Sequence, residues 1–340
     1  MPKKRFKSKK SKNKKIFKIR YILYIVSIYI ISNLTFNYLK DKKINIDNKE
    51  FINILLSSNN NLIKKDYNSS KIINSIFKFF SNIDITSPVT ALDSSIASNV
   101  VKIDNNHTDN YDNIDELEKI SNYIEDPNPV EIQEPIVYLY NSHQLENYSQ
   151  NNLEVYNIKP NVMLTSYMLR ENLNNAGINT IVEETNVTEL LRVNNWKGSK
   201  AYDATRLLIN DAKDKNKSLK YFIDLHRDSV SKDKTTITIN NVAYARFYFV
   251  IGLENPNYAE NMKFAKKLDS ILNSSHKGIS KGILQKQGKG VNGVYNQDID
   301  KNLILIEVGG VDNTIEEVKN SIDVLSEALI KYIKEDNYGS

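Results

Sequence analysis

The sequence predicts an α/β fold, a mixed, mainly parallel sheet flanked by helices, with an N-terminal transmembrane helix. Three observations support this prediction. From Pro135 onward, short apolar runs alternate with segments of helical periodicity, which is typical of a parallel sheet covered on both faces. Ionisable residues follow several of these runs, and such sheets bind ligands at the carboxyl ends of their strands. Residues 21–39 contain no charged residue, which matches the ~20 residues that a bilayer crossing needs.

The basic residues are concentrated at the N terminus. Residues 1–20 contain eleven Lys or Arg and no acidic residue, so the rest of the chain has 35 basic against 41 acidic residues. The net charge of +5 is therefore a property of this tail, and the body is not expected to bind nucleic acid. The chain has no cysteine, which excludes disulfide frameworks, thiolate zinc sites and cysteine nucleophiles.

The chain divides into four segments by composition. We expect residues 1–20 to be a cytoplasmic basic tail and residues 21–39 a single-pass anchor, because basic residues flank a span on its cytoplasmic side. A cleaved signal peptide is the alternative, but no small-residue cleavage site follows and the apolar run is long for one. Residues 40–130 are polar and weakly periodic, as in a variable stalk or linker. Residues 131–338 then form a domain outside the membrane.

Apolar runs and turn signals place the elements of this domain. Four short runs rich in strand formers lie between polar segments, which is typical of buried strands. They are residues 136–140, 178–182, 221–225 and 303–306. Four segments have helical spacing, and Gly177 is expected to cap the first at its C terminus. They are residues 162–175, 199–212, 258–272 and 314–333. Residues 235–240 and 243–251 predict a hairpin that makes the sheet mixed.

Two of the four histidines follow buried strands. His143 comes after the first strand and His226 after the third, and imidazole is the usual nitrogen ligand of zinc. The H-x-x-E spacing of His143 and Glu146 lets one turn present both side chains to a single ion. Glu307 ends the fourth strand at the same edge, where a carboxylate beside a metal-bound water can act as general base. By spacing alone, a metal site and hydrogen-bonded structural histidines fit this pattern about equally well.

Other polar residues each have two interpretations. Asp224 either accepts a hydrogen bond from a metal-bound histidine or bonds to a loop amide. Arg227 and Asp228 are either catalytic or an internal ion pair. Residues 295–298 follow a glycine-rich loop and either contact the substrate or form a turn.

Four segments resemble motifs of a known family. They are Tyr138–Tyr148 with H-x-x-E, Ile223–Asp228 with D-L-H-R-D, Tyr295–Asp298 with N-Q-D, and Leu305–Thr314 with E-x-G-G-x-x-N. In this order they resemble the stage II sporulation protein P family of endospore-forming bacteria, from about Pro135 to the C terminus. Two departures are Ser142, where the family usually has Thr, and Glu183-Glu184, where it often has His-Asp.

The resemblance implies a membrane-anchored, zinc-dependent N-acetylmuramoyl-L-alanine amidase. Such hydrolases cut the amide between muramic acid and the stem peptide of peptidoglycan, and some also cleave peptide cross-links. The implied role is thinning of the septal cell wall during forespore engulfment, with the catalytic domain in the septal intermembrane space. The implied companions are a lytic transglycosylase and a multi-span membrane protein.

The resemblance also implies roles for particular residues. His143, Glu146 and His226 would bind Zn²⁺, with Glu171 on the first helix as the alternative third ligand. Glu307 would act as the general base.

A second set of residues would act on the substrate. Arg227 would stabilise the tetrahedral oxyanion or bind a stem-peptide carboxylate. The resemblance assigns substrate binding to Asn296, Gln297 and Asn313.

Two other functions compete with the amidase. One is a catalytically silent, wall-binding scaffold, and the other is a zinc carboxypeptidase acting on stem peptides. The presence of both histidines and both glutamates favours an enzyme over the scaffold, and the bond that is cut would distinguish the amidase from the carboxypeptidase. Two histidines and one carboxylate accept several divalent ions, so the metal is not fixed by the sequence.

Overall fold

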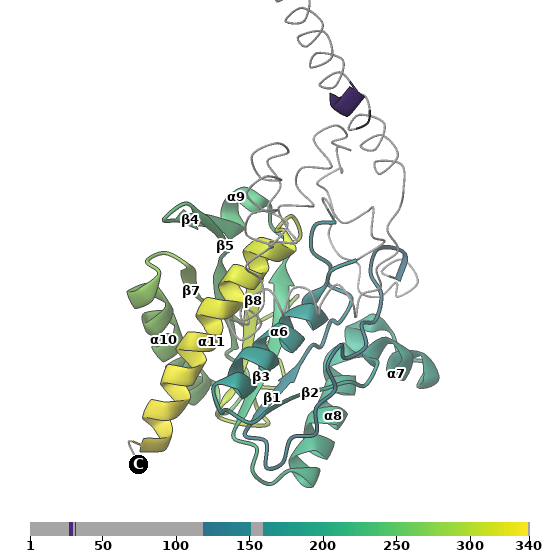
Figure 1. Ribbon diagram of the computed structural model, residues 1–340. Helices are drawn as coiled ribbons and strands as arrows, with labels where there is room; N and C mark the ends of the chain where they lie inside the picture. Colours follow the sequence, from purple (N-terminus) through teal and green to yellow (C-terminus); the bar gives the residue numbers. More distant parts are fainter. Residues whose placement is uncertain (1–26, 30, 32–117, 151–158, 339–340) are drawn as a thin grey trace, which may run out of the picture. The chain divides into compact units, whose positions relative to one another are not determined.

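A computed structural model describes residues 27–29, 31, 118–150 and 159–338 of the chain (Figure 1). The chain divides into two compact units, residues 1–45 and 46–340. In the first unit, residues 27–29 and 31 are helical. The expected tail, most of the expected span and most of the expected stalk lie outside the described residues. Within the described ranges, no helix combines the length and the hydrophobicity that a membrane crossing requires.

The second unit is built on a six-stranded sheet with the order β2-β1-β3-β8-β6-β7. All neighbouring strands pair in parallel except β6 and β8, which are antiparallel. The mixed, mainly parallel sheet of the prediction is therefore confirmed. Its strands are β1 (Val137–Tyr140), β2 (Thr180–Val182), β3 (Tyr221–Asp228), β6 (Phe247–Gly252), β7 (Ser280–Lys286) and β8 (Leu303–Gly310).

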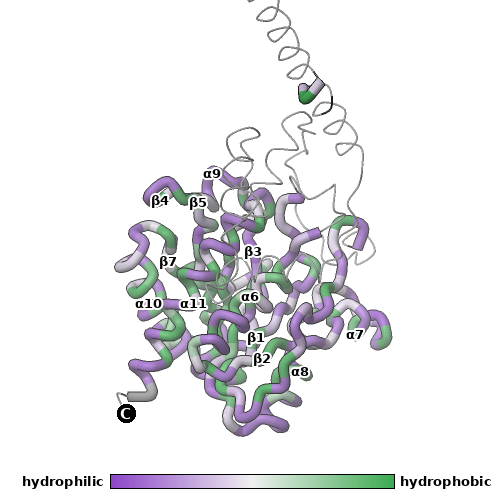
Figure 2. Tube along the Cα trace, viewed as in Figure 1, coloured by the Kyte–Doolittle hydropathy of each residue, from purple (hydrophilic) through white to green (hydrophobic). Residues whose placement is uncertain are grey.

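Helices cover both faces of the sheet. On one face α6 (Val162–Asn175), α10 (Tyr258–Ser275) and α11 (Ile315–Tyr338) bury the larger apolar core (Figure 1). On the other face α8 (Ala201–Lys215) packs Ile209 and Ala212 against aromatic side chains of β1 and β3. The apolar residues follow the strands and the inner sides of these helices, whereas the outer surface is mostly hydrophilic (Figure 2). Three short helices, α7 (Val187–Val193), η3 (Gly198–Lys200) and α9 (Lys232–Thr235), complete the fold.

The two central strands continue beyond their apolar runs. In β3 and β8, His226 lies directly opposite Glu307, and a register shift follows between His226 and Asp228. The expectation that β3 ends before His226 is wrong, because β8 continues as a pairing partner as far as Gly310. The ionisable residues of the D-L-H-R-D motif thus belong to a strand rather than to a loop, which fixes the direction of each side chain.

The expected hairpin exists, but it does not make the sheet mixed. Strands β4 (Thr236–Ile239) and β5 (Val242–Ala245) form a separate two-stranded sheet, turned at Asn240 and Asn241, which both have positive φ. The strand is interrupted at Arg246, whose backbone N–H donates to the carbonyl of Thr235. After this residue β6 joins the main sheet as the antiparallel neighbour of β8. One apolar run therefore supplies two strands of different sheets.

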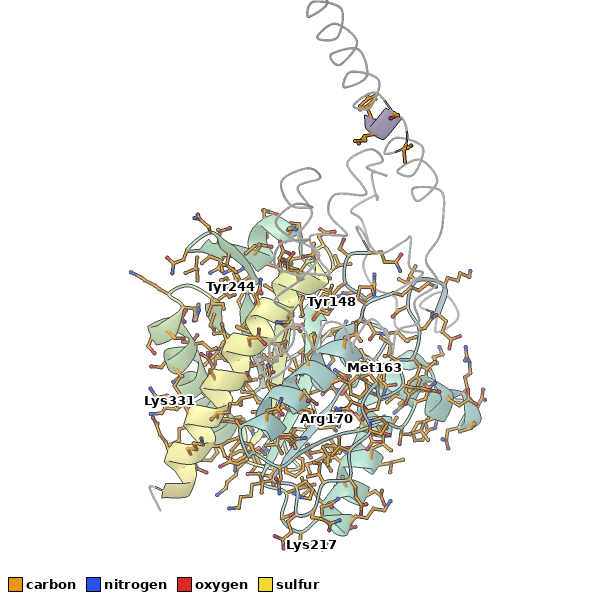
Figure 3. All side chains as sticks on the ribbon, in the orientation of Figure 1. Tyr148, Met163, Arg170, Lys217, Tyr244 and Lys331 are labelled. Atoms are coloured by element: carbon orange, nitrogen blue, oxygen red, sulfur yellow. The ribbon has the colours of Figure 1, made fainter. Side chains whose placement is uncertain are left out.

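The segment before the sheet packs onto the body. We call residues 118–130 the strap. Within it Ile124 is buried, and Asp126 pairs with Arg170 of α6, with both charged side chains buried. The backbone N–H of Ile124 points to the sulfur of Met163 at the start of α6, so the strap follows this helix, on which Figure 3 labels Met163 and Arg170. Packing thus begins before the domain boundary expected at residue 130.

Candidate metal centre

A turn after β1 presents the first two candidate ligands. The backbone N–H of Ser142 donates to Asp224 Oδ1 at 2.9 Å, and its hydroxyl donates to Asp224 Oδ2 at 2.5 Å. The turn closes where the N–H of Glu146 donates to the carbonyl of His143 at 3.1 Å. A threonine hydroxyl could make the same hydrogen bond to Asp224. The serine at position 142, where the family usually has threonine, therefore retains the bond that holds this turn.

His143, Glu146 and His226 lie together. Each offers one ligand atom, and these atoms lie within 4.8 Å of one another. Glu146 Oε1 lies 3.3 Å from His226 Nδ1 and 3.5 Å from His143 Nδ1, and the two imidazole rings are nearly perpendicular with centroids 5.1 Å apart. Two imidazoles and one carboxylate form the donor set of a catalytic zinc site with an open position, so the three residues fit a divalent ion.

Glu146 is held in its ionised form. Its Oε2 accepts the backbone N–H of Arg227 at 2.9 Å, which fixes the carboxylate against β3. Burial alone would raise the pKa of Glu146, but the charge of His226 and hydrogen bonds from His143 and His226 hold it well below its usual value. A carboxylate that stays charged while buried is suited to a cation.

His226 lies between two carboxylates. Its Nε2 is 3.0 Å from Asp224 Oδ1, yet this buried nitrogen makes no aligned hydrogen bond in the described structure. Burial alone would lower the pKa of His226, but the negative charges of Asp224 and Glu146 raise it well above its usual value. Asp224 thus lies where it can orient the imidazole, which was one of its two expected roles.

Glu307 is the candidate general base. It lies opposite His226 on β8, and its Oε2 is buried without a hydrogen-bond partner among the described residues. Burial and the nearby charge of Glu146 raise the pKa of Glu307 to about 8. A buried acceptor without a partner is uncommon and calls for an explanation. A proton donor brought by the reaction would supply the missing partner.

Tyr202 also lies in the site, although no sequence pattern predicts its place there. Its ring packs edge-on against His143 at 5.4 Å and lies roughly parallel to His226 at 6.4 Å, measured between ring centroids. It also contacts Tyr295 edge-on at 5.5 Å. Tyr202 lies in the first turn of α8, and no motif or strand end marks that position.

Arg227 and Glu171 lie outside the group of donors. The Arg227 side chain is 3% exposed, and its Nε donates to the carbonyl of Asn147 at 2.9 Å. Arg227 therefore braces the loop that carries Glu146 with both its backbone and its guanidinium. Glu171, the alternative ligand, accepts a hydrogen bond from Asn128 of the strap and is not among the grouped donors.

The three expected substrate-binding amides are buried and bonded to protein atoms. Asn296 donates to the Tyr202 carbonyl and to Thr205, and Gln297 bonds to the N–H of Gly252 and the carbonyl of Val250. Asn313 accepts the N–H of Gly310 and donates to Thr236 and Glu317. These bonds hold loops around the site in place, and substrate contact by the three amides stays a prediction.

A family model described as Stage II sporulation protein P matches residues 47–330 of the chain. A Bacillus subtilis (strain 168) protein described by the same words is 34% identical over 200 residues, which are 57% of this chain and 50% of the relative. The chain thus spans about half the length of this curated relative.

Solved structures give weaker similarities. An N-acetylmuramoyl-L-alanine amidase from Clostridium difficile 630 has a TM-score of 0.37 at 13% identity, with 60% of this chain and 98% of that chain covered. Ami1, the N-acetylmuramyl-L-alanine amidase from Mycobacterium smegmatis, has a TM-score of 0.34 at 12% identity, with 59% and 98% covered. Cwp6 from Clostridium difficile has a TM-score of 0.36 at 14% identity, with 58% and 29% covered. Scores this low carry no functional argument.

Proposed function

This chain belongs to the Stage II sporulation protein P family, and we propose that it is a peptidoglycan hydrolase that cleaves the N-acetylmuramoyl-L-alanine amide bond. The observation that carries the proposal is the group of two histidines and one glutamate within 4.8 Å, with Glu307 beside it. This arrangement provides a ligand set and a base for hydrolysis of an unactivated amide. A scaffold would have no need of a buried acid whose oxygen has no partner.

In the proposed mechanism, His143, Glu146 and His226 hold Zn²⁺. The bound ion would polarise the scissile carbonyl and lower the pKa of a water molecule. Asp224 orients the His226 imidazole, since its Oδ1 lies 3.0 Å from Nε2. The backbone N–H of Arg227 keeps the Glu146 carboxylate facing both histidines.

Glu307 moves the proton. Its Oε2 takes a proton from the attacking water while the oxygen of that water bonds to the amide carbon. Glu307 Oε2 then gives this proton to the amide nitrogen as the carbon–nitrogen bond breaks, which leaves the carboxylic acid of the muramic acid and a stem-peptide amine. The second proton of the water then passes from the acid to the amine, so the final products are a carboxylate and an ammonium group. Burial and the charge of Glu146 raise the pKa of Glu307 to about 8 in the metal-free protein. A bound cation nearby would lower this pKa and leave the carboxylate ionised, as a general base requires. We assign Arg227 to positioning of the ligand loop, because its guanidinium is bound to Asn147.

The cellular setting follows from the family. We propose that the hydrolase thins septal wall during forespore engulfment, with residues 21–39 as a single-pass anchor and the domain outside the membrane. Its proposed companions are a lytic transglycosylase and a multi-span membrane protein. Cleavage of peptide cross-links is a second activity of the same site that the product analysis below would detect.

The test is digestion of purified peptidoglycan by the full-length protein, followed by mass spectrometry. Free stem peptides beginning with L-alanine, lost with a chelator and restored by added Zn²⁺, would support the proposal. The His226→Ala variant is expected to be inactive and to bind the ion at least 10-fold more weakly, because it lacks one of three ligands. Release of terminal D-amino acids would identify a carboxypeptidase. Intact wall with stoichiometric bound metal would favour a scaffold.

A further inference from the structure

A pocket adjoins the candidate metal centre on the side of α7. It is a small hollow of about 30 Å³ that is partly open to solvent. His143 and Glu146 form the wall that it shares with the metal centre. The opposite wall comes from Val187 and Leu191 of α7 and from Ala201 at the start of α8. A group in this pocket lies against two of the three candidate metal ligands.

Val187, Leu191 and Ala201 present hydrocarbon to the pocket, and two of its polar lining side chains, Ser142 and Gln144, are already bonded to protein atoms. Gln144 accepts the N–H of Val187 at 2.8 Å and donates to the Thr185 carbonyl at 2.9 Å. The Ser142 hydroxyl is bonded to Asp224. Val187 and Leu191 are 3% and 4% exposed, so they are fixed by packing rather than free to move aside. The part of the pocket lined by Val187, Leu191 and Ala201 therefore suits a small apolar group.

We propose that this pocket binds the methyl group on a carbon that flanks the scissile amide, and that Leu191 and Ala201 set the size of the group accepted. The inference rests on the proposed function. Because the pocket shares His143 and Glu146 with the metal centre, a group seated in it is close to the bond being cut. In an N-acetylmuramoyl-L-alanine amide, the acyl carbon and the amine nitrogen each bond to a carbon that carries a methyl group. Both methyls have the required chemistry, so the substrates of the test distinguish them.

The experiment measures kcat/KM of the zinc-loaded, full-length protein on four synthetic muropeptides. One has the natural D-lactyl group and L-alanine. Two replace L-alanine with glycine or with L-2-aminobutyrate, and one replaces the lactyl group with a glycolyl group. One methylene in an apolar pocket changes kcat/KM by roughly tenfold or more. We expect this loss with glycine and with aminobutyrate if the amine side occupies the pocket, or with the glycolyl substrate if the acyl side does.

Two pairs of variants connect the preference to the pocket. Leu191→Ala enlarges it, while Leu190→Ala removes the same atoms from the neighbouring position of the same apolar cluster outside the pocket. Ala201→Val fills the pocket, and Ala204→Val adds the same atoms one turn later in α8. We expect Leu191→Ala to raise, by roughly tenfold, the ratio of kcat/KM for a substrate with a larger flanking group to kcat/KM for the natural substrate. We expect Ala201→Val to shift the kcat/KM ratio in favour of the substrate that lacks the methyl group.

The outcomes separate the two proposals. The pocket assignment is supported if the natural muropeptide is cleaved and the kcat/KM ratios between substrates change in Leu191→Ala and Ala201→Val. The same ratios should stay unchanged in Leu190→Ala and Ala204→Val. Natural cleavage with the same ratios in all variants overturns that assignment and leaves the amidase intact. If the zinc-loaded wild type cleaves none of the four substrates, the proposed function is wrong, and the pocket assignment that rests on it falls as well. Ratios within one variant do not depend on how much of it is folded.

Discussion

The candidate metal centre and the loop of residues 292–298 are two buried polar regions that touch at Tyr202, and they differ in how their polar atoms are satisfied. In the loop, Asn296 and Gln297 each bond to two protein groups. In the candidate metal centre, Glu307 Oε2 is buried without a hydrogen-bond partner among the described residues. Since buried polar groups are normally bonded, the first arrangement stabilises a fold and the second is suited to a ligand. Both regions are motifs in the sequence, but only the candidate metal centre leaves a buried carboxylate oxygen without a partner among the described residues.

Glu307→Gln tests the chemical side of this comparison. We expect kcat to fall by about 100- to 10,000-fold, because an amide cannot accept the proton that general base catalysis transfers. Zn²⁺ affinity, measured by titration calorimetry, should stay within a few-fold, since Glu307 is not among the grouped donors. Retained activity would remove Glu307 from the mechanism.

Asp224→Asn tests the support of the ligands. We expect a loss of about 10- to 100-fold in metal affinity or activity, because the amide no longer holds the His226 ring by charge. Competition with a chromophoric chelator measures the affinity. Asp228→Asn is the matched control from the same strand, since Asp228 lies outside the donor group. Equal losses in both variants would contradict a special role for Asp224.

Gln297→Ala tests the structural side. The truncation leaves the Gly252 N–H and the Val250 carbonyl without their partner, so we expect about 2 kcal/mol of lost folding stability. Urea unfolding of the full-length protein measures it. The Zn²⁺ affinity of the folded variant should be nearly unchanged. A selective rise in KM at unchanged stability would instead support the substrate contact predicted for Gln297.

A last prediction is a pH dependence of stability in the metal-free protein. Burial and Glu146 raise the pKa of folded Glu307 from 4.5 to about 8, so its proton is held more tightly in the folded chain than in the unfolded chain. Stability from this group is complete below pH 4.5 and is lost as the pH rises through 8, by at most about 1.4 kcal/mol per unit. Urea unfolding at pH 5.5 and 7.5, in chelator, should show this loss in the wild type relative to Glu307→Gln. If the wild type and Glu307→Gln changed in stability by the same amount between the two pH values, the raised pKa of Glu307 would be contradicted.

Much of the fold could be predicted because its central strands are short apolar runs. The helix at 162–175 was predicted with its bounds, since Gly177 at φ 80° provides a clear C-terminal stop. The strand β7 was missed because Ser280–Lys286 has a lysine near each end and a glycine within it, which weakens the alternation. The helix α7 was missed because its seven residues are too few to establish a helical period.

The grouping of the three candidate ligands could be predicted from their positions after the apolar runs of two strands. His143, Glu146 and His226 come together because β1 and β3 are parallel neighbours, so the same edge of the sheet receives both histidines. Tyr202 could not be found in this way, since its position depends on how α8 packs across the sheet. The role of Arg227 was also hidden, because alternation along β3 sends its side chain away from His226 and toward Asn147.

The strap has a practical consequence for anyone who shortens this protein. A version beginning at residue 131 would lack Asp126, which neutralises the buried guanidinium of Arg170, and Ile124, which is 1% exposed. It would also lack Ser121 and Asn122, which bond to the side chain of Asn161 at the start of α6. Asn161 bridges to Asn147, the neighbour of Glu146. A fragment that begins at the compositional boundary would therefore lack contacts that support the loop carrying the candidate ligands His143 and Glu146, and loss of the proposed activity in such a fragment would not test the proposal.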